Sequence, residues 1–416
     1  MTFKRVVITG VGALTPIGNT REQYWESLKN GKSGAAAITR FDATLFKTKF
    51  ACEIKGFEVA NFMDRKEARK LDPFTQYAMV VADEAINDSK LSLKEIDPDR
   101  AGVIWGSGIG GLLTFQEEVK AYARGDGTPR FNPFFIPKMI PDLSAGHISI
   151  KYGFRGPNFA TVSACASSTN SIYDAFTYIR LGKSDIMVSG GSEAAICEAG
   201  VGGFNAMRAL SERNNSPETA SRPYDKDRDG FVLGEGAGAV ILEEYEHAKR
   251  RGAKIYAEIL GGGLTADAYH ITAPHPEGAG ITKVMEHALE ESGLSPGEVD
   301  YINTHGTSTP LGDIGEIKAI QKVFGEHAYK LTISSTKSMT GHLLGAAGAI
   351  EVIACLMAIE QGIVPPTINH FTDDEGLDPK LNLTFNKAQK REVNVALSNT
   401  FGFGGHNASI ILRKAK

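Results

Sequence analysis

Short apolar runs alternate with longer amphipathic segments along most of the chain. The short runs predict strands over Arg5–Thr9, Gly102–Trp105, Ile186–Ser189, Val299–Asn303 and Leu331–Ser334. Segments with apolar residues every three or four positions predict helices over Phe74–Ser89, Ser171–Leu181, Ile281–Ser292 and Glu316–Phe324. We therefore predict an α/β chain with largely parallel sheets. It ends in an antiparallel hairpin, in which Val393–Ser398 and Ala408–Leu412 flank a glycine-rich turn.

A helix, a turn and a strand recur in the same order in both halves of the sequence. Ala85 corresponds to Ala288 and Asp97 to Asp300, and the offset is 203 positions in each pair (288 − 85 and 300 − 97). This repeat predicts a duplicated fold, with one half at 1–250 and the other at 251–416. Chance similarity between two common helix–turn–strand units is the alternative.

Composition excludes several classes of partner. A net charge of −4 over 416 residues gives no general attraction to nucleic acid or to an anionic membrane. Glu351 interrupts the most apolar segment, Gly348–Ile359, so we expect no membrane span. The four cysteines are widely spaced without a CxxC pair, and no signal-peptide pattern follows Met1. These features predict a cytoplasmic protein.

Cys165 is the first candidate catalytic residue. It lies in the small-residue segment Thr161–Asn170, between a predicted strand and a predicted helix. At a helix N-terminus, unpaired N–H groups and the helix dipole favour the nucleophilic thiolate. We therefore expect the helix terminus, more than a dedicated base, to lower the pKa of this thiol. Taken alone, the residue fits a buried structural cysteine better.

Two histidines each follow a predicted strand, at the end where α/β sheets bind ligands. His305 lies in Asn303–Pro310, and His342 lies in Ser335–Gly348. Two neutral imidazoles beside a nucleophilic cysteine suit a reaction that develops negative charge on a thioester carbonyl, such as an enolate formed by decarboxylation.

Two other chemistries fit these residues less well. A zinc site is disfavoured because His305 and His342 are 37 residues apart and no second thiol is nearby, so we expect no metal. A cysteine protease needs one base histidine and an orienting Asn or Asp, which leaves the second histidine and Lys337 unexplained.

The segment Asn399–Asn407 predicts a hairpin loop whose glycines permit close approach to a ligand. A backbone N–H of this loop is expected to form an oxyanion hole with the N–H of Cys165. A plain glycine-rich turn with two core aromatics is the alternative.

At these four motifs the chain resembles the β-ketoacyl-[acyl carrier protein] synthases, most closely the elongating synthase II type. The resemblance runs nearly end to end, through Val7–Gly12, Gly203–Ser211, Arg222–Asp225, Asp229–Val232 and Pro365–Asn369. It implies a thiolase-like duplicated fold with a five-layered α-β-α-β-α core, usually a homodimer.

The resemblance also implies an acyltransferase of fatty-acid biosynthesis that catalyses a decarboxylating Claisen condensation. Cys165 takes an acyl group from the phosphopantetheine thioester of an acyl carrier protein. His305 and His342 promote decarboxylation of malonyl-[acyl carrier protein] and steady the enolate. Attack of the enolate on the acyl thioester gives 3-oxoacyl-[acyl carrier protein] and carbon dioxide, without a free cofactor.

Further site residues follow from the resemblance alone. Lys337 belongs to the catalytic set near the histidines, and Glu351 supports it. Thr307 and Thr309 contact the pantetheine arm. Phe401 covers the acyl pocket as a gate, and Phe403 joins the substrate-binding set.

A basic stretch, Arg65–Lys70, predicts a helix face on which positions 66, 69 and 70 cluster. Such a charge run is usually only solvated. The resemblance adds an acidic carrier protein as partner, docked by Lys66, Arg69, Lys70 and Arg208.

Alternatives remain within and beyond the family. A thiolase-type acyl transferase would need a second catalytic cysteine near the C-terminus, where the chain has His406. His406 also departs from the Thr that this family often carries there, which leaves the fine substrate preference open. A chain-length-determining partner subunit would lack the nucleophile. A specialised polyketide or aryl-polyene ketosynthase shares every catalytic residue and is the strongest alternative.

Overall fold

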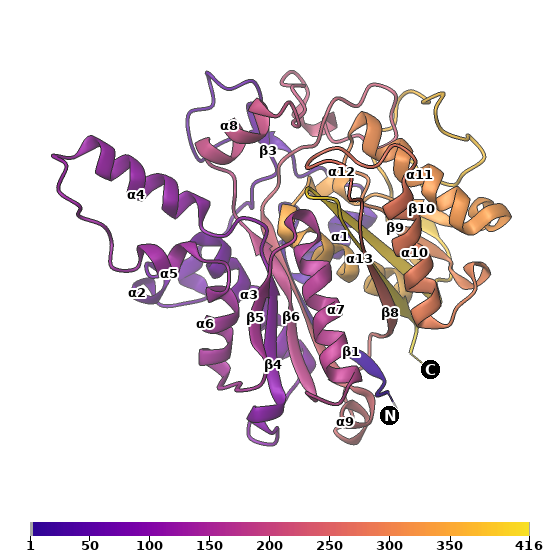
Figure 1. Ribbon diagram of the computed structural model, residues 1–416, viewed down its shortest axis with the longest axis horizontal. Helices are drawn as coiled ribbons and strands as arrows, with labels where there is room; N and C mark the ends of the chain where they lie inside the picture. Colours follow the sequence, from indigo (N-terminus) through magenta and orange to yellow (C-terminus); the bar gives the residue numbers. More distant parts are fainter. Residues whose placement is uncertain (1–2, 416) are drawn as a thin grey trace.

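The computed structural model describes residues 3–415 and builds them around one ten-stranded sheet (Figure 1). The strands of its first half are β1 (Val6–Leu14), β4 (Ala101–Gly106), β5 (Asn158–Thr161), β6 (Ile186–Glu193) and β7 (Gly236–Glu244). Those of the second are β8 (Ala257–Ala266), β9 (Tyr301–Asn303), β10 (Thr332–Ser334), β13 (Val395–Gly402) and β14 (His406–Arg413). Two small sheets pair β2 (Ala36–Ala37) with β3 (Phe50–Ala51), and β11 (Ile363–Val364) with β12 (Gln389–Lys390).

The two halves of the sheet repeat one strand order. The first runs β5-β4-β6-β7-β1, and the second runs β10-β9-β13-β14-β8, so the strands correspond one to one in chain order. The halves join where Val6–Ile8 of β1 pairs antiparallel with Ala257–Ile259 of β8. This repeated topology is the arrangement that a duplicated fold requires, while the boundary at residue 250 stays a prediction.

The expectation of largely parallel sheets was wrong. Parallel pairing is confined to the outer strands, β10-β9, β9-β13, β4-β6 and β4-β5. The pairs at the centre, from β6 through β7, β1, β8 and β14 to β13, are antiparallel. The sequence pattern did not predict β7 and β8, because their runs of small and glycine residues do not alternate with β-branched residues. The predicted C-terminal hairpin is confirmed by β13 and β14.

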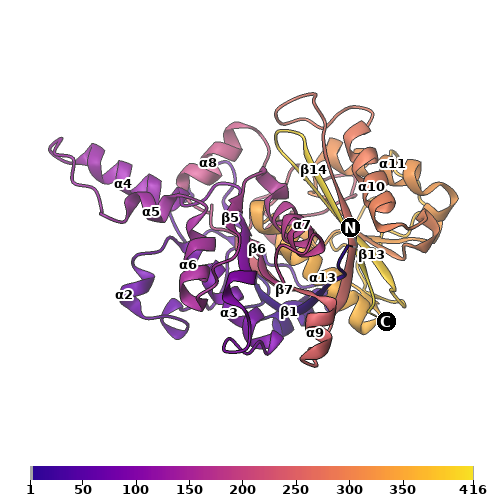
Figure 2. The ribbon, with the colours of Figure 1, turned by 60° about the horizontal axis from the view of Figure 1, so that its bottom comes forward.

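Helices cover both faces of each half and make five layers. α7 (Ser167–Arg180) and α13 (Ala347–Gln361) contact each other and strands of both halves, and so form the middle layer (Figure 2). α3 (Pro73–Ser89) covers the outer face of the first half. α10 (Ala279–Ser292) and α11 (Pro310–Phe324) cover that of the second. The remaining helices are α1 (Arg21–Lys29), α2 (Arg65–Ala68), α4 (Leu112–Arg124), α5 (Phe135–Met139), α6 (Leu143–Tyr152), α8 (Glu198–Ala206), α9 (Tyr245–Arg250) and α12 (Lys337–Thr340).

One segment is longer and more apolar than expected from the sequence, which predicted no membrane span. Leu344–Gln361, which ends with α13, is long and hydrophobic enough to cross a membrane, with a mean hydropathy of 1.5. In the fold 89% of this segment is buried, and the Glu351 that interrupts it pairs with buried Lys337. Its hydropathy is therefore that of a central core helix.

Candidate active site

A sharp turn presents Cys165 between β5 and α7. The residue lies in a short 3-10 turn, η3 (Ala164–Ala166), directly before α7. Ala164 has φ 51°, a left-handed conformation that costs energy for a residue with a side chain. The predicted position at a helix N-terminus is confirmed. The turn places the sulfur beyond the end of β5, where it faces the second half of the fold.

The second half repeats this turn beside His342. Leu344, in the 3-10 turn η7 (Leu344–Ala346) before α13, has φ 47°, close to that of Ala164. The backbone of His342 is held to the segment before β7 by an isolated bridge, because its N–H donates to Val232 O at 2.8 Å and its carbonyl accepts from Gly234 N at 2.9 Å. The duplicated turns therefore bring the cysteine and this histidine face to face.

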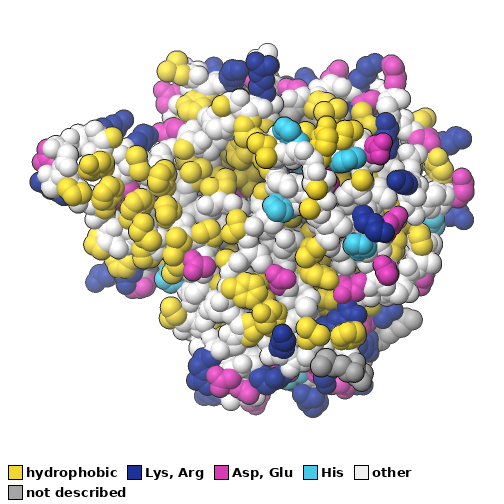
Figure 3. All heavy atoms as spheres, in the orientation of Figure 1, with side chains coloured by type: hydrophobic (Ala, Val, Ile, Leu, Met, Phe, Trp, Pro, Cys, Tyr) yellow, Lys and Arg dark blue, Asp and Glu magenta, His cyan; other side chains and the backbone are white. Residues whose placement is uncertain are grey.

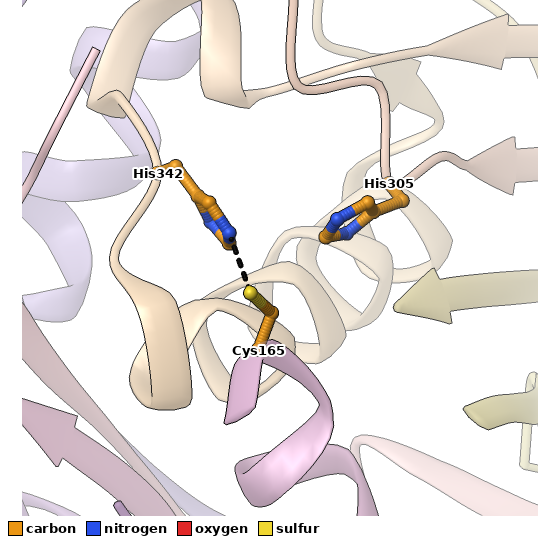
Figure 4. Close-up of side chains that lie close together, drawn as sticks. All are labelled: Cys165, His305 and His342. Carbon is orange, nitrogen blue, oxygen red and sulfur yellow. Dashed lines mark hydrogen bonds between the residues drawn. The ribbon is translucent and has the colours of Figure 1, made fainter. Parts of the chain in front are cut away.

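His305 lies at the carboxyl end of β9, as predicted. Glu316 on α11 accepts hydrogen bonds from the N–H groups of His305 and Gly306, both at 2.9 Å. Figure 4 shows both imidazole rings pointing towards the sulfur from different elements. The rings of His305 and His342 are nearly perpendicular, with centroids 5.2 Å apart.

Cys165 and His342 are in direct contact. Nε2 of His342 lies 2.9 Å from Sγ of Cys165, a short distance for a hydrogen bond that involves sulfur (Figure 4). Nδ1 of His305 and of His342 has no hydrogen-bond partner among the described residues. No partner on Nδ1 therefore fixes the tautomer of either ring, and the contact of His342 with the thiol is made through Nε2.

Both histidines are neutral over the physiological pH range. Burial lowers the pKa of His305 and of His342 well below the usual value, because it disfavours the charged ring. The positive charge of Lys337 lowers both pKa values further. Lys337 is itself buried and forms an ion pair with Glu351. The sequence-based expectation of two neutral imidazoles is confirmed.

The expected activation of Cys165 was wrong in sign. Burial raises the pKa of this thiol to about 12, although the charge of Lys337 and a hydrogen bond from the Phe403 N–H act in the opposite direction. The helix terminus does not outweigh this desolvation. The resting residue is a neutral thiol, and His342 is the group in position to take its proton.

We predict that alkylation of Cys165 by iodoacetamide rises about tenfold per pH unit from pH 6.5 to 9, because the thiolate fraction grows at that rate below the pKa. Neither histidine titrates in this window. The rate is measured by intact mass, with Cys165→Ala as the blank. A plateau at or below pH 8 would show that the thiol pKa is lowered instead.

The three side chains lie in one cavity of about 1140 Å³. The predicted substrate contacts Thr307, Thr309, Phe401 and Phe403 all line it. The cavity extends well beyond the three catalytic candidates, and apolar side chains such as Ile109, Phe204 and Ile281 form part of its wall. It has room for a long, mainly apolar substrate next to the sulfur.

The glycine turn lies against the nucleophile. A Cβ at Gly402 would come within 3.0 Å of the Cys165 nitrogen and 2.8 Å of the Ser163 oxygen, so only glycine permits this approach. Phe403 follows it directly, and its N–H points at the Cys165 side chain. Two backbone N–H groups thus lie close to the position that a carbonyl oxygen on this sulfur would take.

Two family models account for most of the sequence. The N-terminal domain of beta-ketoacyl synthases matches residues 3–248, and the C-terminal domain matches residues 256–371. The chain belongs to the β-ketoacyl synthase family. The sequence-based resemblance is thereby confirmed.

Curated relatives of this β-ketoacyl synthase align over nearly their whole length. A 3-oxoacyl-[acyl-carrier-protein] synthase 2 from Synechocystis sp. is 50% identical over 99% of this chain and 98% of its own. The protein of the same name from Coxiella burnetii is 49% identical over 100% and 99%.

Solved ketosynthases share the fold. A β-ketoacyl synthase from Burkholderia phymatum superimposes with a TM-score of 0.92 at 34% identity, covering 99% of this chain and 100% of its own. A type II polyketide ketosynthase, solved in complex with its acyl-carrier protein, gives 0.91 at 34% identity with full coverage of both chains. The expected thiolase-like fold is therefore confirmed.

The predicted docking residues do not form one cluster in a single β-ketoacyl synthase chain. Lys66 and Arg69 are exposed at α2, which is only one turn long and ends before Arg69, so the predicted helix face is shorter than expected. Lys70 is half-buried and pairs with Glu67 at 2.7 Å. Arg208 lines the main cavity next to α8, and Figures 1 and 2 show α2 and α8 well apart.

Sequence reasoning missed two buried glutamates. Glu316 was assigned only as the start of a helix, although it holds the backbone of His305. It shares a buried face of α11 with Asp313, Ile317 and Ile320. The signal in the sequence is therefore a glutamate that recurs at the helical spacing of the buried apolar residues. Glu193, the last residue of β6, is completely buried, and nothing in the residues around it marks it as functional.

The three side chains lie close enough together to bind a metal ion, but the charges around them oppose one. The ligand atoms of Cys165, His305 and His342 lie within 4.8 Å of one another. Zinc would need the thiolate, and burial raises the pKa of this thiol. The charge of buried Lys337 also acts on all three groups and opposes a cation. The absence of a metal stays a prediction.

Proposed function

We propose that this β-ketoacyl synthase elongates fatty-acyl chains by condensing an acyl group on Cys165 with malonyl-[acyl carrier protein], without a free cofactor. The observation that carries the proposal is the contact of 2.9 Å between Cys165 Sγ and His342 Nε2, made beside His305 in a cavity of about 1140 Å³. A nucleophile, a base and a second neutral imidazole thus face one binding space.

In the first half-reaction, Cys165 sulfur attacks the carbonyl carbon of an acyl thioester. His342 Nε2 takes the thiol proton and gives it to the departing pantetheine sulfur, so a carrier thiol leaves and an acyl-cysteine remains. The N–H groups of Cys165 and Phe403 stabilise the carbonyl oxygen while it is negative. Thr307 and Thr309, whose hydroxyls lie 3.0 Å apart at the cavity wall, orient the pantetheine arm.

In the second half-reaction, the malonyl thioester loses carbon dioxide, and the electron pair of the broken bond forms an enolate. The N–H groups of His305 and His342 donate to the enolate oxygen. For this, His342 changes tautomer by proton exchange with solvent between the half-reactions, because its proton is on Nδ1 while Nε2 accepts the thiol proton. The enolate carbon attacks the acyl carbonyl, the Cys165 sulfur leaves with its electron pair, and one proton from solvent converts the thiolate back to the thiol. Burial keeps both rings neutral, and the charge of Lys337, which is paired with Glu351, acts in the same direction.

Relatives favour fatty-acyl elongation over polyketide assembly. The 3-oxoacyl-[acyl-carrier-protein] synthase 2 from Synechocystis sp. is 50% identical to this chain, whereas the solved polyketide ketosynthase is 34% identical. The test is to supply acyl-[acyl carrier protein] and malonyl-[acyl carrier protein] and to analyse the products by mass. A single 3-oxoacyl product with two added carbons supports elongation. Release of chains extended several times without reduction would assign the protein to polyketide assembly.

The acidic carrier protein docks, in this proposal, through Lys66 and Arg69 at α2 and Arg208 at the cavity. We predict that Lys66→Glu with Arg69→Glu raises KM for acyl-[acyl carrier protein] about tenfold, because opposite charges become like charges. KM for an acyl-pantetheine should not change. Lys94→Glu, at an exposed lysine outside this set, is the matched control. Equal KM values in high and low salt would contradict electrostatic docking.

The active form is proposed to be a homodimer. Exposed apolar side chains gather on α4, α5 and their connecting segment, at Phe115, Val119, Tyr122, Phe131, Phe134 and Ile136 (Figure 3). β5 is one of the two edge strands of the sheet, and Val162 beyond it is 60% exposed. A patch of this kind and an open sheet edge favour contact with a second copy of the chain.

Sedimentation of the protein should give twice the chain mass, and the double variant Val119→Asp with Phe131→Asp should give monomers. A monomeric unsubstituted protein would exclude the dimer.

A further inference from the structure

Glu193 is a buried carboxylate without a cationic partner among residues 3–415, and the reaction above does not use it. It lies at the end of β6 with no exposed surface. Its oxygens accept five hydrogen bonds, from Ser107 Oγ at 3.1 Å, Gly108 N at 2.8 Å, Ile109 N at 3.2 Å, Gly110 N at 3.3 Å and Gly345 N at 3.0 Å. Because every neighbour donates, both oxygens must act as acceptors.

The five donors come from two loops, one in each half of the fold. Ser107–Gly110 follows β4, and Gly345 lies in η7 before α13. The loops approach so closely that a Cβ at Gly345 would stand 2.2 Å from the nitrogen of Gly108. Gly108 in turn faces the carbonyl of Ala164, at 3.1 Å from the position of its missing Cβ. The carboxylate therefore joins the two halves through loops, one of which packs against the residue that precedes the nucleophile.

The same loops form the cavity wall next to the sulfur. Gly108, Ile109 and Leu344 line the cavity together with Cys165. A shift of these loops would displace the acyl carbonyl relative to its oxyanion donors. By contrast, His305 is held by Glu316, and His342 is held by the backbone at residues 232 and 234. His305 is thus anchored independently of Glu193, and the backbone of His342 has its own two anchors, although Gly345 follows it by three residues in η7.

We propose that Glu193 is a positioning residue that holds Cys165 and the adjoining cavity wall in register for transfer of the acyl group. It touches no substrate and acts through the two loops. The inference rests on the proposed function, because acyl transfer to Cys165 is the step that it affects.

Glu193→Gln tests this assignment with almost no change in volume. The substitution replaces one acceptor oxygen by an NH2 group, whose hydrogens face the N–H donors of the loops. At least two of the five hydrogen bonds are therefore lost. We expect acylation of Cys165 in a single turnover, followed by intact mass, to slow by about tenfold to 100-fold, the range that small misplacements produce. Carbon dioxide release from malonyl-[acyl carrier protein], started on fully acylated protein, should stay within about threefold of the unsubstituted rate.

Glu84→Gln is the matched control. Glu84 also accepts two backbone N–H groups, from Ala13 at 2.8 Å and Arg21 at 2.9 Å, and does not line the cavity. Both rates should be unchanged in this variant. If Glu193→Gln does not fold, Ser107→Ala removes a single donor and should slow acylation alone, by about threefold.

Two results would overturn the assignment. Acylation at or above the unsubstituted rate would mean that removing the negative charge near the thiol matters more than position. An equal fall of both rates, in step with a lower Tm, would mean that Glu193 only stabilises the fold. If the unsubstituted protein is not acylated, the proposed function fails instead.

Discussion

Replacing Cys165 by alanine is expected to abolish condensation. The substitution removes the only atom in the cavity that can carry an acyl group as a thioester, so kcat/KM should fall by at least about 10⁴-fold, as when other covalent nucleophiles are lost. Product formation from acyl-[acyl carrier protein] and malonyl-[acyl carrier protein] measures the loss.

Cys197→Ala is the matched control for this prediction. Cys197 is as buried as Cys165, but it does not line the cavity. Its replacement should leave kcat/KM within about threefold of the unsubstituted value, since a buried Cys→Ala change affects packing and not the reaction. Residual condensation in Cys165→Ala above about one thousandth would assign the acyl group to another residue.

Replacing His305 by alanine is expected to separate the two half-reactions. The His305 side chain makes no hydrogen bond to the thiol, whereas His342 Nε2 lies 2.9 Å from it. Loss of one donor to the enolate oxygen should slow carbon dioxide release by about 10²-fold to 10³-fold. Acylation of Cys165 should persist within about tenfold, because its proton acceptor is still present.

His342→Ala should behave differently, since it removes both the proton acceptor and a donor to the enolate. Acylation and carbon dioxide release should both fall by about 10²-fold or more. Rapid-quench kinetics of the two steps distinguish the variants. Equal effects of the two substitutions on acylation would contradict the division of labour between the histidines. His327→Ala, at a histidine outside the cavity, controls for changes in stability.

The positions of the catalytic candidates were predictable because each depends on local sequence. Cys165 sits between a strand and a helix, and His305 follows a strand, and both patterns are visible in consecutive residues. The glycine turn was predictable for the same reason, since Gly402 and its neighbours interrupt two alternating strands. The repeat at an offset of 203 residues likewise indicated two similar halves before the strand order was known.

The pKa of Cys165 and the long-range contacts were not predictable. The helix terminus suggested a lowered pKa for Cys165, but the thiol is enclosed by both halves of the fold, and desolvation raises its pKa instead. The hydrogen bonds of Glu193 join residues 107–110, which precede it by 83 to 86 positions, to residue 345, which follows it by 152 positions. The antiparallel centre of the sheet depends on pairing between β1, β7 and β8, which no local pattern encodes.

The most direct measurement of the central claim is the intact mass of the protein after incubation with acyl-[acyl carrier protein] alone. The account predicts one added acyl group per chain, located at Cys165 by peptide mapping and discharged as a 3-oxoacyl product when malonyl-[acyl carrier protein] is added. No acyl adduct, or an adduct of equal amount in Cys165→Ala, would contradict it.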